Sequence, residues 1–213
     1  MAALLALGGC SSQTTIWNQY FQVVREGWRN YSGSGRVTLE QAAQIPYATL
    51  AYRVDGGSEE MLILATSTNG NLLWTSVSRV VLMTRDGRVQ RSVGLRHDRG
   101  GMSPENGSSS LPPPAQALRQ PYRSVRLVDF PETGLHGVRV TCTTVARGTE
   151  MVTVLGSALL ARRVDESCES NRPRWSFTDR YWVDADSGFV WQSLQHLHPS
   201  GPILHVKILR PPE

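Results

Sequence analysis

From about residue 47 to the C-terminus, apolar and polar residues alternate in short runs, and this two-residue period is typical of half-buried β-strands. The β-forming runs lie at 47–54, 60–67, 72–84, 88–95, 122–130, 137–145, 150–157, 159–166, 174–184, 188–197 and 203–210. Turn sequences such as Asn69-Gly70 and Asp86-Gly87 separate many of them and are typical of hairpins. About eleven sequential strands must curl to cover their apolar face. The sequence therefore predicts a mainly β fold, an antiparallel meander forming a barrel or half-barrel.

Two helices are expected before the strands. Apolar residues recur at helical spacing at Ile16, Trp17, Tyr20, Phe21, Val24 and Trp28. They predict an N-terminal amphipathic helix that packs on the β domain, with a position on a membrane surface as the alternative. Thr38 and Gln41 have the spacing of a capping box, which predicts a short second helix that ends before Pro46.

Residues 97–121 interrupt the strand pattern because they are rich in Gly, Ser and Pro. This composition predicts a long exposed loop. The chain of 213 residues is long enough for one sizeable core, and no repeat or second domain boundary is visible.

The first ten residues form a short apolar run that ends in two glycines and Cys10. The run is too short to span a bilayer. Leu7-Gly8-Gly9-Cys10 is similar to a bacterial lipobox, in which the cysteine is acylated and becomes the N-terminus. The alternative is a short apolar N-terminus with a free Cys10. Only nine residues precede Cys10 and none is basic, so we expect the complete signal to begin upstream.

The lipobox divides the chain into three parts. We expect a lipoprotein signal remnant at residues 1–9, a lipid-anchored linker at 10–15 and a single β-rich lipoprotein domain at 16–213. Ser11 follows the cysteine at a position where aspartate favours retention in the inner membrane. The expected location is therefore the periplasmic face of the outer membrane, with the domain held by its lipid anchor.

The charge pattern disfavours a nucleic-acid partner. Lysine and arginine number 22 against 18 acidic residues, and Lys207 is the only lysine. The arginines are spread along the chain, whereas a nucleic-acid-binding protein usually concentrates its positive charge. We expect mostly solvated surface charge. The alternative is contact with an acidic polymer or with anionic lipid head groups, because guanidinium groups suit carboxylate and phosphate.

Cys142 and Cys168 remain as a pair if Cys10 carries lipid. In an oxidising periplasm such a pair can form a disulfide, and two free thiols are the alternative. The spacing matches no zinc pattern.

The common catalytic and cofactor motifs are absent from the sequence, so it predicts no catalytic residue and no cofactor. Asp179, Asp184 and Glu132 are carboxylates without the spacing of a glycosidase pair. His196 and His198 share one face of a strand, but a turn centred on Ser200 places His205 opposite Gln195, on the other face. No metal site is predicted.

Several stretches together resemble the YjbF/GfcB lipoprotein family, which is associated with exopolysaccharide and group 4 capsule operons. They are Ile45-Pro46-Tyr47-Ala48-Thr49-Leu50, Leu72-Leu73-Trp74 with residues 81–89, Tyr181-Trp182-Val183-Asp184 with Val190-Trp191-Gln192-Ser193, and Ile208-Leu209-Arg210-Pro211-Pro212. The resemblance implies an outer-membrane lipoprotein with a β meander and a role in polysaccharide production or export, without an assigned catalytic residue.

The leading hypothesis is a non-catalytic accessory factor that contacts polysaccharide or export proteins. Indoles stack on sugar rings, and arginines beside a turn bind anionic groups, so we expect contacts at Trp74, Arg85, Arg88, Trp182 and Trp191. The alternatives are a polysaccharide hydrolase or lyase, which requires a cleft with convergent groups, and a protein-binding adaptor, which requires an exposed apolar patch or edge strand.

Overall fold

A computed structural model describes residues 37–212, so Cys10 and the predicted helix at residues 16–28 lie outside the described residues. The described chain begins with the short helix α2 (Leu39–Ala43). Thr38 caps this helix through a capping box with Gln41, because each side chain accepts a hydrogen bond from the other residue's backbone N–H. The second predicted helix is confirmed. Within residues 37–212, no helix is long and apolar enough to cross a membrane.

Twelve strands follow the helix in a single antiparallel sheet. They are β1 (Thr49–Val54), β2 (Glu60–Thr68), β3 (Asn71–Thr75), β4 (Val81–Arg85), β5 (Arg88–Val93), β6 (Gly101–Pro104), β7 (Tyr122–Phe130), β8 (Leu135–Val154), β9 (Ser157–Asn171), β10 (Arg174–Val183), β11 (Val190–His196) and β12 (Ile203–Arg210). Two short 3-10 helices, η1 (Pro114–Leu118) and η2 (Pro131–Thr133), interrupt the connections.

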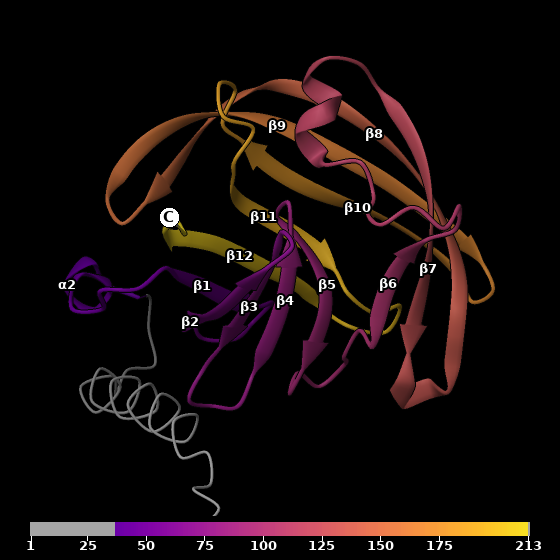
Figure 1. Ribbon diagram of the computed structural model, residues 1–213, viewed down its shortest axis with the longest axis horizontal. Coiled ribbons are helices and arrows are strands. Elements are labelled where there is room, and N and C mark those ends of the chain that lie inside the picture. Colours follow the sequence, from indigo (N-terminus) through magenta and orange to yellow (C-terminus); the bar gives the residue numbers. More distant parts are fainter. Residues whose placement is uncertain (1–36, 213) are drawn as a thin grey trace, which may run out of the picture. The chain divides into compact units, whose positions relative to one another are not determined.

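The sheet wraps into a nearly closed barrel, as Figure 1 shows. The strand order is β5-β4-β3-β2-β1-β12-β11-β10-β9-β8-β7-β6, so the first strand pairs with the last. Every other pairing joins strands adjacent in sequence, and the two edges are β5 and β6. The predicted antiparallel meander and its barrel form are therefore confirmed.

The strands differ from the predicted runs in three places. The expected run at 72–84 is divided by a turn, in which the Ser76 hydroxyl accepts a hydrogen bond from the Val80 N–H. The runs at 137–145 and 150–157 join into the 20-residue β8, because an irregularity in pairing between Ala146 and Thr149 lets the strand continue. The expected loop at 97–121 contains β6 and η1, where Ala117 is buried and anchors the segment to the barrel.

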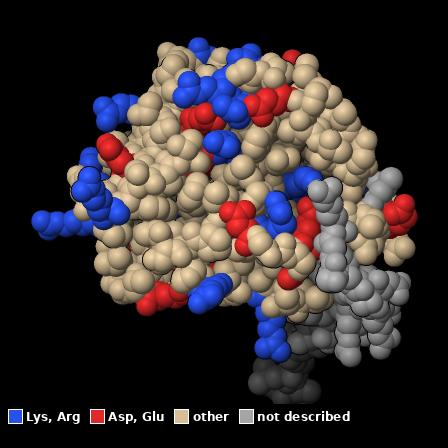
Figure 2. All heavy atoms as spheres, turned by 180° about the vertical axis from the view of Figure 1, so that it is seen from behind, with Lys and Arg blue, Asp and Glu red and all other residues tan. Residues whose placement is uncertain are grey.

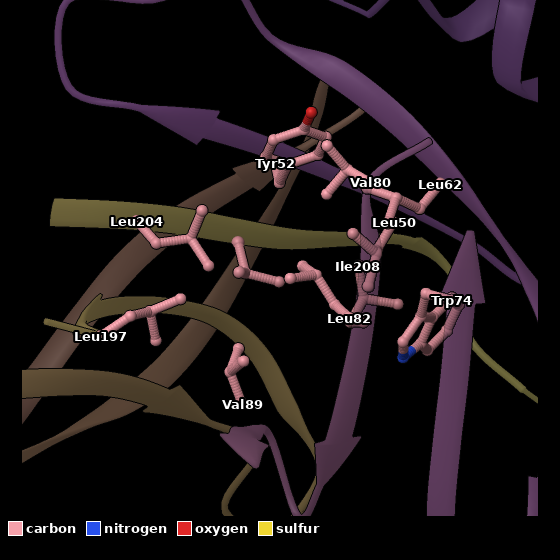
Figure 3. Close-up of a cluster of buried hydrophobic side chains, with 11 residues drawn as sticks. Leu50, Tyr52, Leu62, Trp74, Val80, Leu82, Val89, Leu197, Leu204 and Ile208 are labelled. Atoms are coloured by element: carbon pink, nitrogen blue, oxygen red, sulfur yellow. The ribbon is translucent and has the colours of Figure 1, made fainter. Parts of the chain in front are cut away.

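An apolar cluster fills the part of the interior next to β1–β5 and β12. Figure 3 shows these side chains pointing toward one another from several strands. The buried members are Leu50, Tyr52, Leu62, Trp74, Val80, Leu82, Val89, Leu197, Leu204, Val206 and Ile208. Leu50 and Tyr52 point into this cluster from one face of β1, and Thr49 and Ala51 on its other face are buried as well.

Side chains from inside the barrel bond to the free edge of β5. The Val89 N–H donates to Gln195 Oε1 over 2.9 Å, and the Val89 carbonyl accepts from Arg99 Nη1 over 2.7 Å. The Ser92 N–H donates to the Arg99 carbonyl over 2.9 Å. Because unpaired strand edges invite association with other chains, these contacts protect an edge that strand pairing leaves open.

Charged side chains are mixed on the surface. Figure 2 shows basic and acidic side chains interspersed on the face opposite to that of Figure 1. Exposed ion pairs contribute to this mixing; Arg139, for example, bonds Glu105 through two nitrogens, at 2.6 and 3.2 Å. This distribution agrees with the weak basic bias of the sequence.

Candidate functional site

The barrel interior holds a cluster of five charged side chains, which we call the buried charge cluster. It consists of Arg88 on β5, Arg99 before β6, Arg126 on β7, Glu166 on β9 and Asp179 on β10. None is more than 1% exposed. Charged side chains are almost never buried so completely unless they are paired, so the cluster is the most distinctive chemical feature of the described chain.

Glu166 is the centre of the buried charge cluster. Its Oε1 accepts from Arg88 Nη2 over 2.7 Å, and its Oε2 accepts from Arg126 Nη1 over 3.0 Å. The hydroxyls of Thr144 and Tyr181 each lie 3.3 Å from its carboxylate oxygens. One carboxylate therefore joins β5, β7, β8, β9 and β10 through charge-assisted and neutral hydrogen bonds.

The second carboxylate, Asp179, links the cluster to the end of β11. Asp179 Oδ1 accepts from the His196 N–H over 2.8 Å, and Arg126 Nη2 lies 3.7 Å from Oδ2. Arg99 instead uses carbonyl acceptors: its Nη1 binds the Val89 carbonyl, and its Nη2 binds the His196 carbonyl over 2.7 Å. Arg99 therefore bridges β5 to β11 across the interior.

The cluster remains ionised because its members compensate one another. Burial raises the pKa of Glu166, but Arg88 and Arg126 outweigh that effect and lower the pKa to about 2. Burial likewise lowers the pKa of Arg88, yet the charge of Glu166 raises it overall above its ordinary value. Arg99 donates to carbonyl groups instead. Burial together with the neighbouring Arg126 outweighs the opposite effect of Asp179 and lowers the pKa of Arg99 to about 10. Burial, with the nearby Glu166 and Asp179, raises the pKa of Tyr181.

The geometry suits a structural role for this cluster rather than catalysis. A general acid or base must reach the substrate, and it requires a proton affinity near the working pH. Glu166 and Asp179 are buried, and Glu166 is held as a carboxylate by two arginines. The cluster therefore fixes the strands relative to one another.

Three of the five expected polysaccharide contacts point away from solvent, which corrects their assignment. Trp74 is 0% exposed, and its Nε1 donates to Thr84 Oγ1 over 2.8 Å inside the barrel. Trp182 is 8% exposed beneath the β8–β9 hairpin, and its Nε1 donates to Glu150 Oε2 over 2.8 Å. Arg88 belongs to the buried charge cluster. These side chains cannot stack on a sugar or bind an anion at the surface.

The other two expected contacts keep part of their surface. Trp191 is half-buried, and its ring packs edge-on against Phe189 with centroids 4.9 Å apart. Arg85 is half-buried next to the Asp86-Gly87 turn. Of the five side chains, Trp191 and Arg85 alone remain available for a ligand.

Cys142 and Cys168 face each other across β8 and β9, and their sulfurs are bonded in the structure. Their Cα atoms are 4.1 Å apart, and the bridge lies in an apolar cluster with Phe130 and Phe177. Within the described chain, the bridge sulfurs and Glu166 form the one close group of metal-ligand types. A disulfide offers no thiolate to a metal, so this group serves the core.

The histidines occupy separate environments, and the predicted strand register was wrong by one residue. His205 pairs with Leu194, not Gln195, because the turn begins earlier and His196 pairs with Ile203. His205 Nε2 contacts Asp55, whereas His196 Nδ1 contacts Asp179. The two imidazoles are thus engaged by different carboxylates.

The carboxylates considered for polysaccharide cleavage also lie apart. Asp184 accepts hydrogen bonds from the N–H and hydroxyl of Ser187 in the β10–β11 turn, and these bonds lower its pKa. Glu132 contacts His97, while Asp179 belongs to the buried charge cluster. Each therefore has its own structural partner instead of facing another across a cleft.

The buried arginines were not predicted from the sequence, because arginine was expected on the solvated surface. A signal was present in β7, where Ser124, Arg126, Val128 and Phe130 occupy alternating positions. All four are buried, so this alternation places Arg126 on the core face. Glu166 shows the same signal, because it alternates with the buried Val164 and Cys168 along β9.

Two adjoining hollows on the side of the barrel formed by β7–β10 were also not foreseen. Their volumes are about 480 and 520 Å³, and they share Arg123 and Thr141. Hydroxyl side chains line much of the larger one, namely Thr141, Thr143, Ser167, Ser176 and Thr178. These hollows offer donors and acceptors of the kind that bind polar ligands.

The buried charge cluster predicts a large effect of Glu166→Gln. The substitution leaves two buried arginines without their carboxylate, so we expect the free energy of unfolding to fall by about 3–5 kcal/mol in denaturant titrations. The matched control is Glu105→Gln, which removes the exposed partner of Arg139 and should cost at most about 1 kcal/mol. Equal losses in the two variants would contradict the role assigned to Glu166.

His198 predicts a pH dependence of stability. It is buried, its ring stacks on His97 with centroids 5.0 Å apart, and burial followed by the charge of His97 lowers its pKa. Below pH 6.5 the folded protein therefore holds fewer protons than the unfolded chain. The free energy of unfolding is highest above pH 6.5 and decreases as the pH falls below this value, by at most about 1.4 kcal/mol per pH unit.

Denaturant titrations between pH 7.5 and 5.5 measure this dependence. His198→Gln should flatten the loss, since it removes the titrating group. His136→Gln, which changes an exposed histidine, should leave the dependence as in the wild type. A wild-type slope that persists in His198→Gln would show that another group is responsible.

Comparisons with known proteins place these features in a family. Residues 32–209 match the family described as "Group 4 capsule polysaccharide lipoprotein gfcB, YjbF". The lipoprotein GfcB of Escherichia coli K12, described as uncharacterized, is 24% identical over 176 residues, covering 82% of this chain and 81% of the relative. The lipoprotein YjbF of the same organism, also described as uncharacterized, is 25% identical over 199 residues, covering 91% and 87%.

The fold is similar to a solved structure as well. The crystal structure of the hypothetical lipoprotein YmcC from Escherichia coli K12 matches with a TM-score of 0.71 and 21% identity, over 97% of this chain and 100% of that one. The family match extends from before α2 to residue 209 in β12, and therefore includes all twelve strands and the buried charge cluster. The chain belongs to the YjbF family of group 4 capsule polysaccharide lipoproteins.

Proposed function

We propose that this chain is an outer-membrane lipoprotein, anchored through Cys10, that acts as a non-catalytic accessory factor in the production or export of capsule or exopolysaccharide. The observation that carries the proposal is the buried charge cluster. Its carboxylates are committed to arginines and backbone groups, so the barrel is a scaffold that presents its outer surface. A hydrolase or lyase requires acidic or basic groups that reach the polymer, and the carboxylates considered above have structural partners instead.

The proposed contacts are polysaccharide and the export proteins of the same pathway. The hollows on β7–β10 support polymer binding, because their hydroxyls and Arg123 can hydrogen-bond to sugars and to anionic substituents. Trp191 and Arg85 are the remaining contacts from the sequence analysis. Membrane attachment rests on acylation of Cys10, and Ser11 favours the outer membrane over the inner one.

The test compares wild type with Cys10→Ala, both expressed behind a complete lipoprotein signal in a strain that lacks the native gene. Acylation is followed by protein mass, location by membrane fractionation and exported polymer by assay of surface polysaccharide. We expect Cys10→Ala to lose both the acyl mass and surface polymer at an equal protein level. Ser11→Asp is the matched control for location, and it should move the acylated protein to the inner membrane.

The proposal has two ways to fail. An unacylated wild-type protein would remove the lipid anchor. Normal surface polysaccharide in cells that lack the protein altogether would remove the role in capsule or exopolysaccharide.

A further inference from the structure

The β8–β9 hairpin extends past the rest of the barrel. Thr149 pairs with Arg162, and the two strands continue together to a turn at Leu155-Gly156, whereas β10 ends opposite Arg162. Figure 1 shows this hairpin curving outward on the side where the C-terminus lies. We call residues 149–162 the hairpin arm.

The two faces of the hairpin arm have different environments. On one face, Val152 and Ala161 are buried against Trp182, which holds the arm against the barrel. On the other face, Met151 and Leu160 stand directly opposite each other and are 61% and 67% exposed. They are the most exposed large hydrophobic side chains in the described part of the chain. One face therefore fixes the arm, and the other presents apolar surface to whatever lies outside.

The turn at the tip carries an unusual residue. Leu155 and Gly156 have φ values of 48° and 81°, almost the same as Asn69-Gly70 and Asp86-Gly87 in the two other tight turns. Asparagine and aspartate tolerate this left-handed conformation, whereas leucine does so rarely. The arm thus has a large apolar residue at its apex although this chain uses polar residues in the equivalent turns.

The charged residues of the arm, Glu150 and Arg162, lie only at its base. Residues 151–161 contain no charged side chain. At the base, Arg162 Nη2 lies 3.5 Å from the carbonyl of Arg147. Arg147 is paired with Asp165, and Glu150 is paired with Arg163. An uncharged tip with a charged base that includes arginines matches the layering of a membrane interface, in which acyl chains lie beneath charged head groups.

The arm also lies at the end of the barrel where the chain enters. Thr49 at the start of β1 pairs with Arg210 at the end of β12. The start of β11 lies beside this end of β12, and Val190 there pairs with Val183 at the end of β10. Val183 in turn pairs with Arg162 at the base of the arm, so all of these residues lie at the same end of the barrel. Residues 37–48 approach β1 at this end, and Tyr47 there is exposed.

We propose that the hairpin arm inserts Met151, Leu155 and Leu160 into the interfacial layer of the membrane that holds the protein. A narrow convex tip fits a fluid apolar layer better than the flat surface of another protein. The inference rests on the membrane anchoring in the proposed function, and is independent of any role in capsule production. The arm would act as a second attachment that fixes the orientation of the barrel relative to the bilayer.

The first test measures binding to vesicles of phosphatidylethanolamine and phosphatidylglycerol in a 3:1 ratio by flotation. The full chain carries Cys10→Ser, so that no acyl chain contributes. We expect the double variant Met151→Ser/Leu160→Ser to lower the partition coefficient by at least about tenfold, because two apolar side chains are lost. The matched control, Val77→Ser/Val93→Ser, changes two other exposed apolar residues and should bind as the parent does. Equal binding by parent and Met151→Ser/Leu160→Ser would overturn the inference.

The second variant, Leu155→Asn, separates membrane insertion from damage to the fold. Asparagine suits the turn conformation, so we expect the midpoint of thermal unfolding to rise while vesicle binding falls. An increase in the midpoint with unchanged binding would contradict the insertion of the tip.

A local reporter distinguishes lipid from other occupants. In the acylated protein, Leu160→Trp should add a fluorescence component that shifts to the blue on vesicle binding and is quenched by brominated lipid, whereas Val93→Trp should add none. A fluorescence component that is already blue-shifted without vesicles would show that protein covers this face. Dimers of the wild type that become monomers in Met151→Ser/Leu160→Ser would show the same, and either result would overturn the inference. If Cys10→Ala cells lose capsule but the hairpin arm of the acylated protein does not insert, only this inference is refuted. If the arm inserts but there is no capsule defect, only the role in capsule production is refuted.

Discussion

The pairing of Glu166 with Arg88 and Arg126 is the interaction on which the rest of the barrel depends. A lone buried carboxylate or arginine is very unfavourable, so each of these side chains requires the others to be in place. The pairing aligns β5, β7 and β9, which are distant in sequence, and their neighbours then adopt one register. Removing one member would leave the others buried without a charge partner, which is strongly destabilising.

The network also explains how the barrel closes without a complete ring of paired strands. Gln195 reaches the edge of β5 from inside the barrel, and Arg99 reaches it from the neighbouring loop. The interior is consequently occupied by packed and hydrogen-bonded side chains, and two features stand out on the outer surface. Those features are the hydroxyl-lined hollows on β7–β10 and the apolar hairpin arm, which lie on different parts of the barrel.

The meander could be predicted from sequence because alternation and turn residues are local signals, as at Asn69-Gly70 and Asp86-Gly87. The positions of the candidate site residues could not be predicted, because the direction of a side chain depends on strand register and on how the barrel closes. Trp74 and Arg88 have the chemistry of sugar contacts, yet closure turns both inward. The register of His205 was missed by one residue, since the turn before β12 carries no strong signal for its length.

Amide hydrogen exchange at Val89 and Ser92 tests most directly the claim that interior side chains close the barrel. We predict that these two edge amides are protected as strongly as that of Val164 in the centre of β9, and that Gln195→Ala exposes Val89 while leaving Val164 protected. Exchange of Val89 and Ser92 in the wild type at the rate of unbonded amides would show that the seam is open, and would contradict a barrel closed by its own side chains.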